Sequence, residues 1–235
     1  MRVEPDKERD ERIRRELKGS GLAGILAWFP EDDVMTCGLW TCLGVNLCLY
    51  PAAGKPVVYA PENEPADTVP EFADARTFSL GPGWPDRLAR LLDEDLQRLG
   101  LKHDEIGVPG DGGGHAVSAF PGETPPLSFG VVSGMFPKGS RPVTADSLFA
   151  ELGSKKTGEE QVAVRAANRA AETGLKAFYD AVRPGKTEAE VAAAVEYAVH
   201  CSSGQDGYSL ARGWAHVQAG ENIYFSGTYS RSSNN

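Results

Sequence analysis

The chain has 235 residues, of which 41% are hydrophobic, and this is enough for one or two domains with a packed core. Its formal net charge is −9, which argues against a nucleic-acid-binding protein whose affinity comes from phosphate contacts. The longest apolar run, residues 22–29, is far shorter than the roughly 20 residues of a membrane helix, and the charged N-terminus has no apolar signal core. We therefore expect a cytoplasmic protein with neither a membrane nor a nucleic acid as partner.

The first 60 residues predict one helix and three strands. Residues 5–19 are rich in charged side chains and predict an N-terminal helix, and the apolar residues 22–28 predict a buried strand. Residues 39–50 and 55–60 predict two further strands. The Pro-Ala-Ala-Gly sequence between these two strands predicts a hairpin turn.

The next segments alternate between strand and helix. Residues 61–71 are acidic and proline-rich and predict a loop, and a short strand is expected at 76–80. Residues 85–99 carry leucines at helical spacing and predict an amphipathic helix, and residues 106–108 predict another strand. This alternation is typical of an α/β domain with a sheet flanked by helices.

The middle of the chain is expected to hold a loop and then a domain boundary. Residues 109–126 are rich in glycine and proline, with one short helix expected at 114–120. The boundary is predicted within 140–156. On this interpretation the first domain covers residues 1–145 and the second covers residues 150–235.

The stretch 156–190 predicts two helices with a short connection between them. A Thr-x-x-Glu spacing, typical of a helix-capping box, occurs at 157–160 and again at 187–190. Between the two boxes, apolar residues recur at steps of three and four, which indicates the apolar stripe of a helix. The members of this stripe are Val164, Ala167, Ala171, Leu175, Phe178 and Val182. A Pro-Gly pair then ends the first helix.

Several motifs, in this order, resemble one known superfamily. A Lys-Thr-x-x-Glu sequence at 156–160, a long helix, a Pro-Gly-x-Thr-Glu sequence at 184–188 and a second helix resemble the start of the pita-bread catalytic domain of the creatinase, prolidase and aminopeptidase P superfamily. The sequence 217–222 resembles the family strand that ends in Gly-x-Asn. Residues 10–60 resemble the family's N-terminal domain, with an arginine-rich helix and then a Cys-Gly pair where the family usually has Thr-Gly or Ser-Gly.

The resemblance implies a fold in two parts. The first is a creatinase-type α/β domain with a mixed sheet flanked by helices, and the second is the start of an α+β pita-bread domain. The implied function is that of a metal-dependent Xaa-Pro dipeptidase or aminopeptidase, in which two divalent cations (Mn, Co or Zn) activate a water that cleaves a peptide or amide C–N bond. The implied partners are a peptide or small amide substrate and a second copy of the chain, as a homodimer.

The resemblance also implies that the metal ligands and catalytic residues lie outside this chain. In the superfamily, two Asp, one His and two Glu bind the metals, and all follow the Gly-x-Asn strand, whereas the residues after Asn222 contain no Asp, Glu or His. We therefore expect this chain to be the N-terminal portion of such a hydrolase, inactive alone, with no catalytic residue, metal ligand or bound cation of its own. Helices of an incomplete pita-bread domain would leave part of their apolar surface exposed, which favours association.

His216 is the one residue that we select as a candidate for substrate binding. It lies on a strand-like segment just before Gly220, in a region that lines the active-site side in the family; the alternative is a histidine at the edge of the core, bonded to a backbone carbonyl. The substrate-binding His of aminopeptidase P relatives has no counterpart at 226–229. Two alternatives therefore stay open: a creatinase- or ectoine-hydrolase-like enzyme acting on a small C–N bond, or a non-catalytic binding or dimerisation module of the same fold.

The remaining motifs predict structural roles. The sequence 19–24 spells G-x-G-x-x-G, but it follows a helix and precedes a strand, which is the reverse of a dinucleotide site. The glycine-rich sequence 110–115 predicts a surface loop, and Asp32 and Asp33 beside Pro30 predict a solvated turn. The four cysteines form no C-x-x-C pair, and we expect reduced thiols, three of them in or beside apolar strands.

Overall fold

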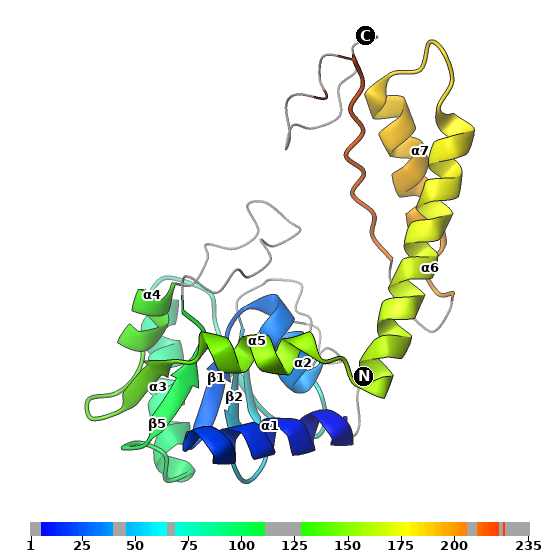
Figure 1. Ribbon diagram of the computed structural model, residues 1–235. Coiled ribbons are helices and arrows are strands. Elements are labelled where there is room, and N and C mark those ends of the chain that lie inside the picture. The colour runs from blue at the N-terminus through cyan, green and yellow to red at the C-terminus, as the bar shows by residue number, and fades with distance from the viewer. Residues whose placement is uncertain are drawn as a thin grey trace. The chain divides into compact units, whose positions relative to one another are not determined.

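The computed structural model divides the chain into two compact units, Met1–Thr157 and Gly158–Asn235. The residues that it describes are 6–39, 46–64, 69–110, 128–205, 211–220 and 223. The first unit is a sheet with helices on both faces, and the second is a helical hairpin followed by an extended segment (Figure 1). None of the described helices combines the length and hydrophobicity that crossing a membrane requires.

The described elements of the first unit are six strands and five helices. The strands are β1 (Gly24–Ala27), β2 (Leu47–Pro51), β3 (Val57–Pro61), β4 (Asp74–Phe78), β5 (Glu105–Val108) and β6 (Arg141–Thr144). The helices are α1 (Lys7–Ser20), α2 (Pro30–Cys37), α3 (Trp84–Arg98), α4 (Phe129–Gly134) and α5 (Asp146–Ser154). The second unit contains α6 (Gly158–Ala181) and α7 (Glu188–Cys201).

The six strands form one mixed sheet in the order β4-β3-β2-β1-β5-β6. Strands β2 and β3 form the predicted antiparallel hairpin, and β1 pairs antiparallel with β2. Strand β4 runs parallel to β3, and β5 and β6 continue the sheet parallel to β1. The prediction of an α/β domain with a mixed sheet is confirmed.

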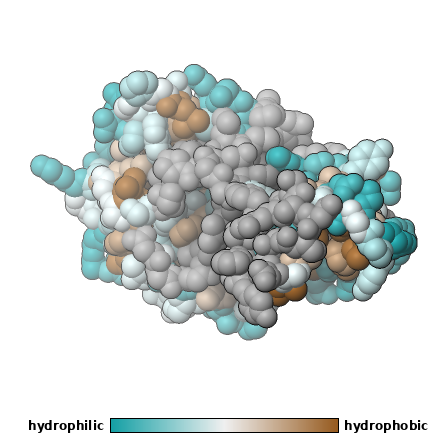
Figure 2. Space-filling model, turned by 90° about the horizontal axis from the view of Figure 1, so that it is seen from above, coloured by the Kyte–Doolittle hydropathy of each residue, from teal (hydrophilic) through white to brown (hydrophobic). Residues whose placement is uncertain are grey.

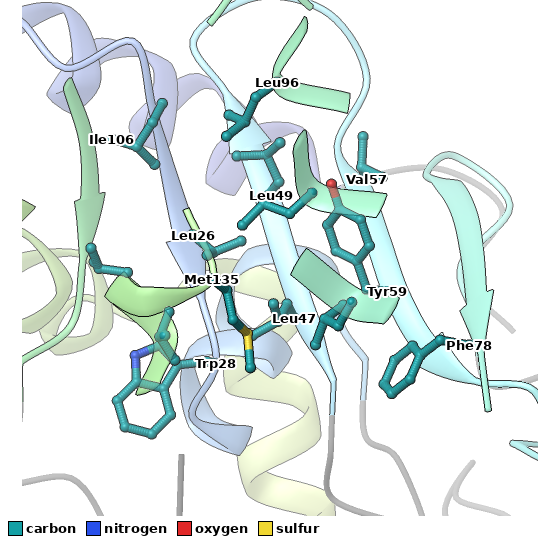
Figure 3. Packing of buried hydrophobic residues seen from close by; sticks show 14 residues of the cluster. Leu26, Trp28, Leu47, Leu49, Val57, Tyr59, Phe78, Leu96, Ile106 and Met135 are labelled. Atoms are coloured by element: carbon teal, nitrogen blue, oxygen red, sulfur yellow. The ribbon is translucent and has the colours of Figure 1, made fainter. Parts of the chain in front are cut away.

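The inner strands β1, β2 and β3 are buried on both faces, and successive side chains of each strand point to opposite sides of the sheet. In β1, Leu26 packs into one hydrophobic cluster, and Ile25 and Ala27 pack into the other. Helices α3 and α4 cover the first cluster, where Leu26, Leu49 and Tyr59 come together (Figure 3). Helices α1, α2 and α5 cover the second. Each fully buried Leu or Ile stabilises this arrangement by about 1.5–3 kcal/mol.

A buried polar contact joins the start of α1 to the end of the first unit. Asp6 caps α1 by accepting from the backbone N–H of Arg9 at 3.2 Å, and it also accepts a hydrogen bond from the Thr157 hydroxyl. Arg9 is 2% exposed and donates to the carbonyl oxygens of Leu152 and Lys155, the latter at 3.0 Å. Segments about 150 residues apart in the sequence are thereby tied together.

The helical hairpin of the second unit has the second predicted capping box. The Thr187 hydroxyl accepts from the backbone N–H of Glu190, and the Glu190 carboxylate accepts from the backbone N–H of Thr187 at 2.9 Å. Lys186 and these Thr187 contacts together lower the pKa of Glu190 to about 2. The box therefore fixes the start of α7 as expected.

The face that α6 buries is not the predicted apolar stripe. Its buried residues are the small ones, Ala166, Ala170 and Gly174, which let α6 and α7 approach closely. In the predicted stripe, Val164 and Leu175 are 46% and 60% exposed. The prediction that the stripe stays partly exposed is confirmed, and hydrophobic residues reach the surface among hydrophilic ones in Figure 2.

Four short elements, α2, α4, β6 and α5, were not predicted from the sequence. Strand β6 and helix α5 lie within the predicted boundary 140–156, and helix α4 lies in a stretch for which no element was predicted. Strand β6 has four residues with no inward–outward alternation, and α5 is stabilised by Phe149 and Leu152 in the second cluster. The helix predicted at 114–120 lies outside the described residues.

Candidate functional site

The carboxyl ends of three parallel strands meet at one edge of the sheet. Strands β1, β5 and β6 are parallel neighbours, so the residues that follow them lie close together. The indole N–H of Trp28, after β1, donates to the carbonyl of Pro109, after β5, at 3.2 Å. The backbone N–H of Gly110 donates to the carboxylate of Asp146, after β6, at 2.6 Å. These contacts make the edge a defined polar surface rather than a set of independent loops.

Asp32 and Asp33 lie in the first turn of α2, and the prediction of a solvated turn is wrong. The helix begins at Pro30, and the two carboxyl side chains are 6% and 1% exposed. Proline is favoured at the first helical position and acidic residues are favoured in the first turn, so Pro30-Glu31-Asp32-Asp33 begins a helix. This signal was present in the sequence but was interpreted as a proline turn.

Both aspartates resist ionisation. Burial raises the pKa of Asp32 to about 7, with smaller contributions from the nearby carboxylates of Glu31 and Asp146. Burial also raises the pKa of Asp33, and the neighbouring Cys37 and Asp32 act in the same direction. A helix N-terminus normally stabilises a carboxylate, but here the loss of solvation dominates.

The extended segment 211–220 is held to α7 by backbone hydrogen bonds. The N–H of Ala215 donates to the Glu196 carboxylate at 3.0 Å, and the N–H of Ala219 donates to the Glu188 carboxylate at 2.7 Å. Glu188 and Glu196 were not recognised from the sequence, because their spacing on a helix looks like that of ordinary surface acids. They fix the register of the segment that carries His216.

His216 is an exposed side chain on this segment. Its ring lies 5.9 Å from that of Trp214, which is 42% exposed. Residues at odd positions from 211 to 217 are buried or half-buried, whereas 212, 214 and 216 are exposed, as in a strand with one covered face. His216 is therefore available to solvent rather than part of the core.

The described residues do not fit a metal centre. Within them, no group of three or more His, Cys, Asp or Glu side chains is arranged to hold a metal ion. The carboxylates of Glu188 and Glu196, which hold the segment of His216 to α7, accept backbone hydrogen bonds instead. The two divalent cations implied by the sequence resemblance thus have no site in this part of the chain.

The remaining sequence motifs have structural positions. Gly21 ends α1 with φ 73° before β1 begins, which confirms that the glycine-rich sequence there joins a helix to a strand. Cys37 and Cys48 are buried free thiols, as predicted, and Cys201 is an exposed one. Cys42 lies outside the described residues, as does the glycine-rich sequence after Gly110.

The sequence of the second unit matches a known family model. Residues 162–227 match Metallopeptidase family M24. The resemblance to the creatinase, prolidase and aminopeptidase P superfamily is confirmed. No curated protein sequence matches the chain.

Solved structures of prolidases share the fold. The prolidase from Pyrococcus horikoshii OT3 is 17% identical with a TM-score of 0.55, and the alignment covers 85% of this chain and 50% of that one. The Xaa-Pro dipeptidase from Bacillus anthracis is 16% identical with a TM-score of 0.60, covering 84% and 50%. The X-Pro aminopeptidase from Thermotoga maritima MSB8 is 16% identical with a TM-score of 0.57, covering 84% and 49%.

These identities establish the fold alone. It is an N-terminal α/β domain with a mixed sheet, followed by part of a pita-bread domain. The chain spans about half the length of the solved structures it matches.

Proposed function

We propose that this chain is part of a metal-dependent hydrolase of the Xaa-Pro dipeptidase and aminopeptidase type, which cleaves a peptide or small amide C–N bond. The observation that carries this proposal is the match of residues 162–227 to Metallopeptidase family M24. The solved structures named prolidase, Xaa-Pro dipeptidase and X-Pro aminopeptidase support it at the level of fold. The complete enzyme would be a cytoplasmic homodimer.

The proposed cofactor of the complete enzyme is a pair of divalent cations, Mn, Co or Zn. No described residue is assigned as a ligand, because none lies in a group able to hold a metal. We accordingly propose that this chain alone does not turn over substrate and that the remaining half of the family fold carries the catalytic groups.

The chain would contribute two parts to that enzyme. Residues 1–145 would form the creatinase-type N-terminal domain, and residues 150–235 the first part of the pita-bread domain. The division into compact units at Thr157 and Gly158 supports two parts. His216, exposed beside Trp214, is proposed to contact the substrate.

The test compares this chain with the protein encoded by the complete natural reading frame. Each is assayed with Mn²⁺ on Ala-Pro, as an Xaa-Pro dipeptide, and on creatine, as a small C–N substrate. We expect the complete protein to hydrolyse Ala-Pro, to lose the activity on chelation and to regain it with Mn²⁺, and we expect this chain to be inactive.

Two other results would each replace the proposal. Turnover of creatine without turnover of Ala-Pro would favour the small C–N hydrolase. Tight Mn²⁺-independent peptide binding with no hydrolysis of either substrate would favour the non-catalytic module.

A further inference from the structure

The Asp33 carboxyl in α2 is buried and has few contacts that would stabilise its ionised form. It is 1% exposed, and its Oδ2 accepts a hydrogen bond from the Asn46 side-chain amide. Its Oδ1 has no hydrogen-bond partner in the part of the chain that the structure describes. A buried carboxylate normally needs several hydrogen bonds or a nearby cation, so Asp33 is suited to the neutral, protonated form.

The titratable groups nearest to Asp33 do not supply a positive charge. On α2 itself they are Glu31, Asp32 and Cys37. Strand β2, which packs against α2, adds the buried thiol of Cys48. Helix α5 also packs against α2, and its Asp146 acts on Asp32 rather than on Asp33. Strand β1, also in contact with α2, contains no titratable side chain. The titratable groups that act on this carboxyl, from α2 and β2, are therefore acidic groups and thiols.

Helix α1 also packs against α2, and it does carry basic residues. Arg9 is the buried one, and its hydrogen bonds given above go to the carbonyl oxygens of Leu152 and Lys155. Arg14 pairs with Asp10 at 2.8 Å and donates to the carbonyl of Ala52 at 3.1 Å. Arg12 donates to Glu8 and to the carbonyl of Lys155, and Arg15 pairs with Glu16. These contacts direct the α1 guanidinium groups toward partners other than Asp33, and none of them contributes to the raised pKa of Asp33.

We propose that Asp33 and Asn46 form a proton-dependent clasp, in which the protonated carboxyl holds the first turn of α2 against the start of β2. Loss of the proton would place a negative charge beside Asp32 in a site with one described donor, so the turn would move outward to reach water. The hydrogen bond from Asn46 opposes this release, because an amide donor also stabilises the ionised form, but burial outweighs it in raising the pKa of Asp33.

The clasp lies at the edge of the sheet where β1, β5 and β6 end. Helix α2 follows β1 directly, at the edge where Trp28 bonds to Pro109 and Gly110 bonds to Asp146. Opening the first turn of α2 would loosen this edge while leaving the hairpin of β2 and β3 paired. The clasp would thus make one edge of the N-terminal domain sensitive to pH without unfolding the domain.

Amide hydrogen exchange of α2 tests the clasp, with rates corrected for intrinsic pH dependence and read by NMR or mass spectrometry. The variant is Asp33→Asn, which keeps the shape but cannot ionise. The matched control is Asp86→Asn, because Asp86 is an exposed carboxyl in the first turn of α3. In the wild type, α2 protection should fall about tenfold per pH unit from the ordinary carboxyl pKa of 3.8 up to the raised pKa of buried Asp33 and level off above it, as opening coupled to release of one proton requires. Asp33→Asn should show no such fall, and Asp86→Asn should behave like the wild type.

The clasp is overturned if wild-type α2 protection is constant with pH, or if Asp33→Asn loses protection as the wild type does. A second measurement covers the case in which Asp33→Asn does not fold. The carboxyl ¹³C shift of Asp33 in the wild type should report a protonated group at about pH 6, two units above the usual aspartate pKa. An ionised Asp33 at that pH would contradict the proposal.

Discussion

Arg9 is the residue whose contacts reach furthest along the sequence. Its guanidinium donates to the carbonyl oxygens of Leu152 and Lys155 and is 2% exposed. Replacing Arg9 with Gln would leave buried carbonyl groups without donors, and we expect a loss of about 2–4 kcal/mol in the free energy of unfolding. Urea denaturation of both variants measures this, and Arg15→Gln is the control, since Arg15 pairs with Glu16 at the surface. Equal stability of the two variants would contradict the anchoring role.

The pKa of Asp32, raised by burial to about 7, makes stability depend on pH. In the unfolded chain the group ionises near its ordinary value of 3.8, so between 3.8 and about 7 the folded state binds more protons. The stability of the first unit should therefore fall as pH rises through this window and level off above it, by at most about 4 kcal/mol.

Thermal denaturation at a series of pH values tests this sign. Asp32→Asn should remove much of this fall in stability. The stability of the variant relative to the wild type should therefore be greater above pH 7 than below pH 3.8. Asp86→Asn is the control and should keep the fall, because Asp86 is exposed. A stability that rises with pH through this window would show that Asp32 is ionised in the folded state.

His216 belongs to the proposed function rather than to stability. In the protein encoded by the complete reading frame, His216→Gln should raise KM about tenfold with kcat unchanged, as expected when an interaction common to ground and transition state is lost. His200→Gln is the control, because His200 is an exposed histidine on α7. An unchanged KM for Ala-Pro in His216→Gln would remove His216 from the substrate site.

At the scale of elements, sequence patterns predicted the helices and strands whose apolar residues recur with a regular spacing. Helix α3 carries leucines on one face and was predicted within one residue of each end, and α1 was predicted within two. The β2–β3 hairpin was also predicted, but β2 begins at Leu47, whereas its strand was expected from residue 39. Helix α2 was not predicted, although Pro30 and the three acidic residues after it are typical of a helix start. Burial against other elements favours the helix over a turn here, and the sequence does not show that burial. The buried state of Asp33 could not be predicted for the same reason.

The face of α6 shows a second limit of sequence patterns. Hydrophobicity alone selects the stripe containing Val164 and Leu175, but close packing of two helices selects small residues. A Cβ at Gly174 would lie 2.9 Å from Val199, so this position has no room for a side chain. Sequence periodicity identified the helix and its partly exposed apolar stripe, but not the face of small residues that packs against α7.

The capping box of α7 gives a prediction for this hairpin. Thr187→Ala removes the acceptor for the Glu190 N–H, and we expect it to destabilise α7 by about 0.5–2 kcal/mol. Local hydrogen exchange in the first turn of α7 measures the effect. Thr173→Ala is the control, since Thr173 is an exposed residue inside α6 whose hydroxyl bonds to its own helix. Loss of protection in Thr173→Ala but not in Thr187→Ala would contradict the role of the cap.

At the scale of the whole molecule, the two units differ in how well they cover their hydrophobic residues. In the described residues, the first unit exposes two large hydrophobic side chains, Val34 and Val131. The second unit is smaller and exposes eight, among them Leu175 and Tyr179, which are 60% and 74% exposed. The first unit therefore buries nearly all of its large hydrophobic side chains, whereas the second unit has the exposed apolar surface of a segment that normally packs against further protein.

This difference predicts self-association through the second unit. Leu175 and Tyr179 lie four residues apart on α6, so they share one face, and contiguous exposed apolar surface drives association in water. We expect sedimentation velocity of the purified chain to show a mass that grows with protein concentration. The double variant Leu175→Glu with Tyr179→Glu should shift the distribution toward the monomer.

The control is Val131→Glu, which adds a charge at a similarly exposed position of the first unit. If association is driven by general surface hydrophobicity, both variants would reduce it, whereas a specific α6 face predicts an effect of the double variant alone. A monomer at all concentrations in the wild type would mean that the exposed stripe is too small to associate. The exposed apolar side chains of α6 would then not cause association of the isolated chain in solution.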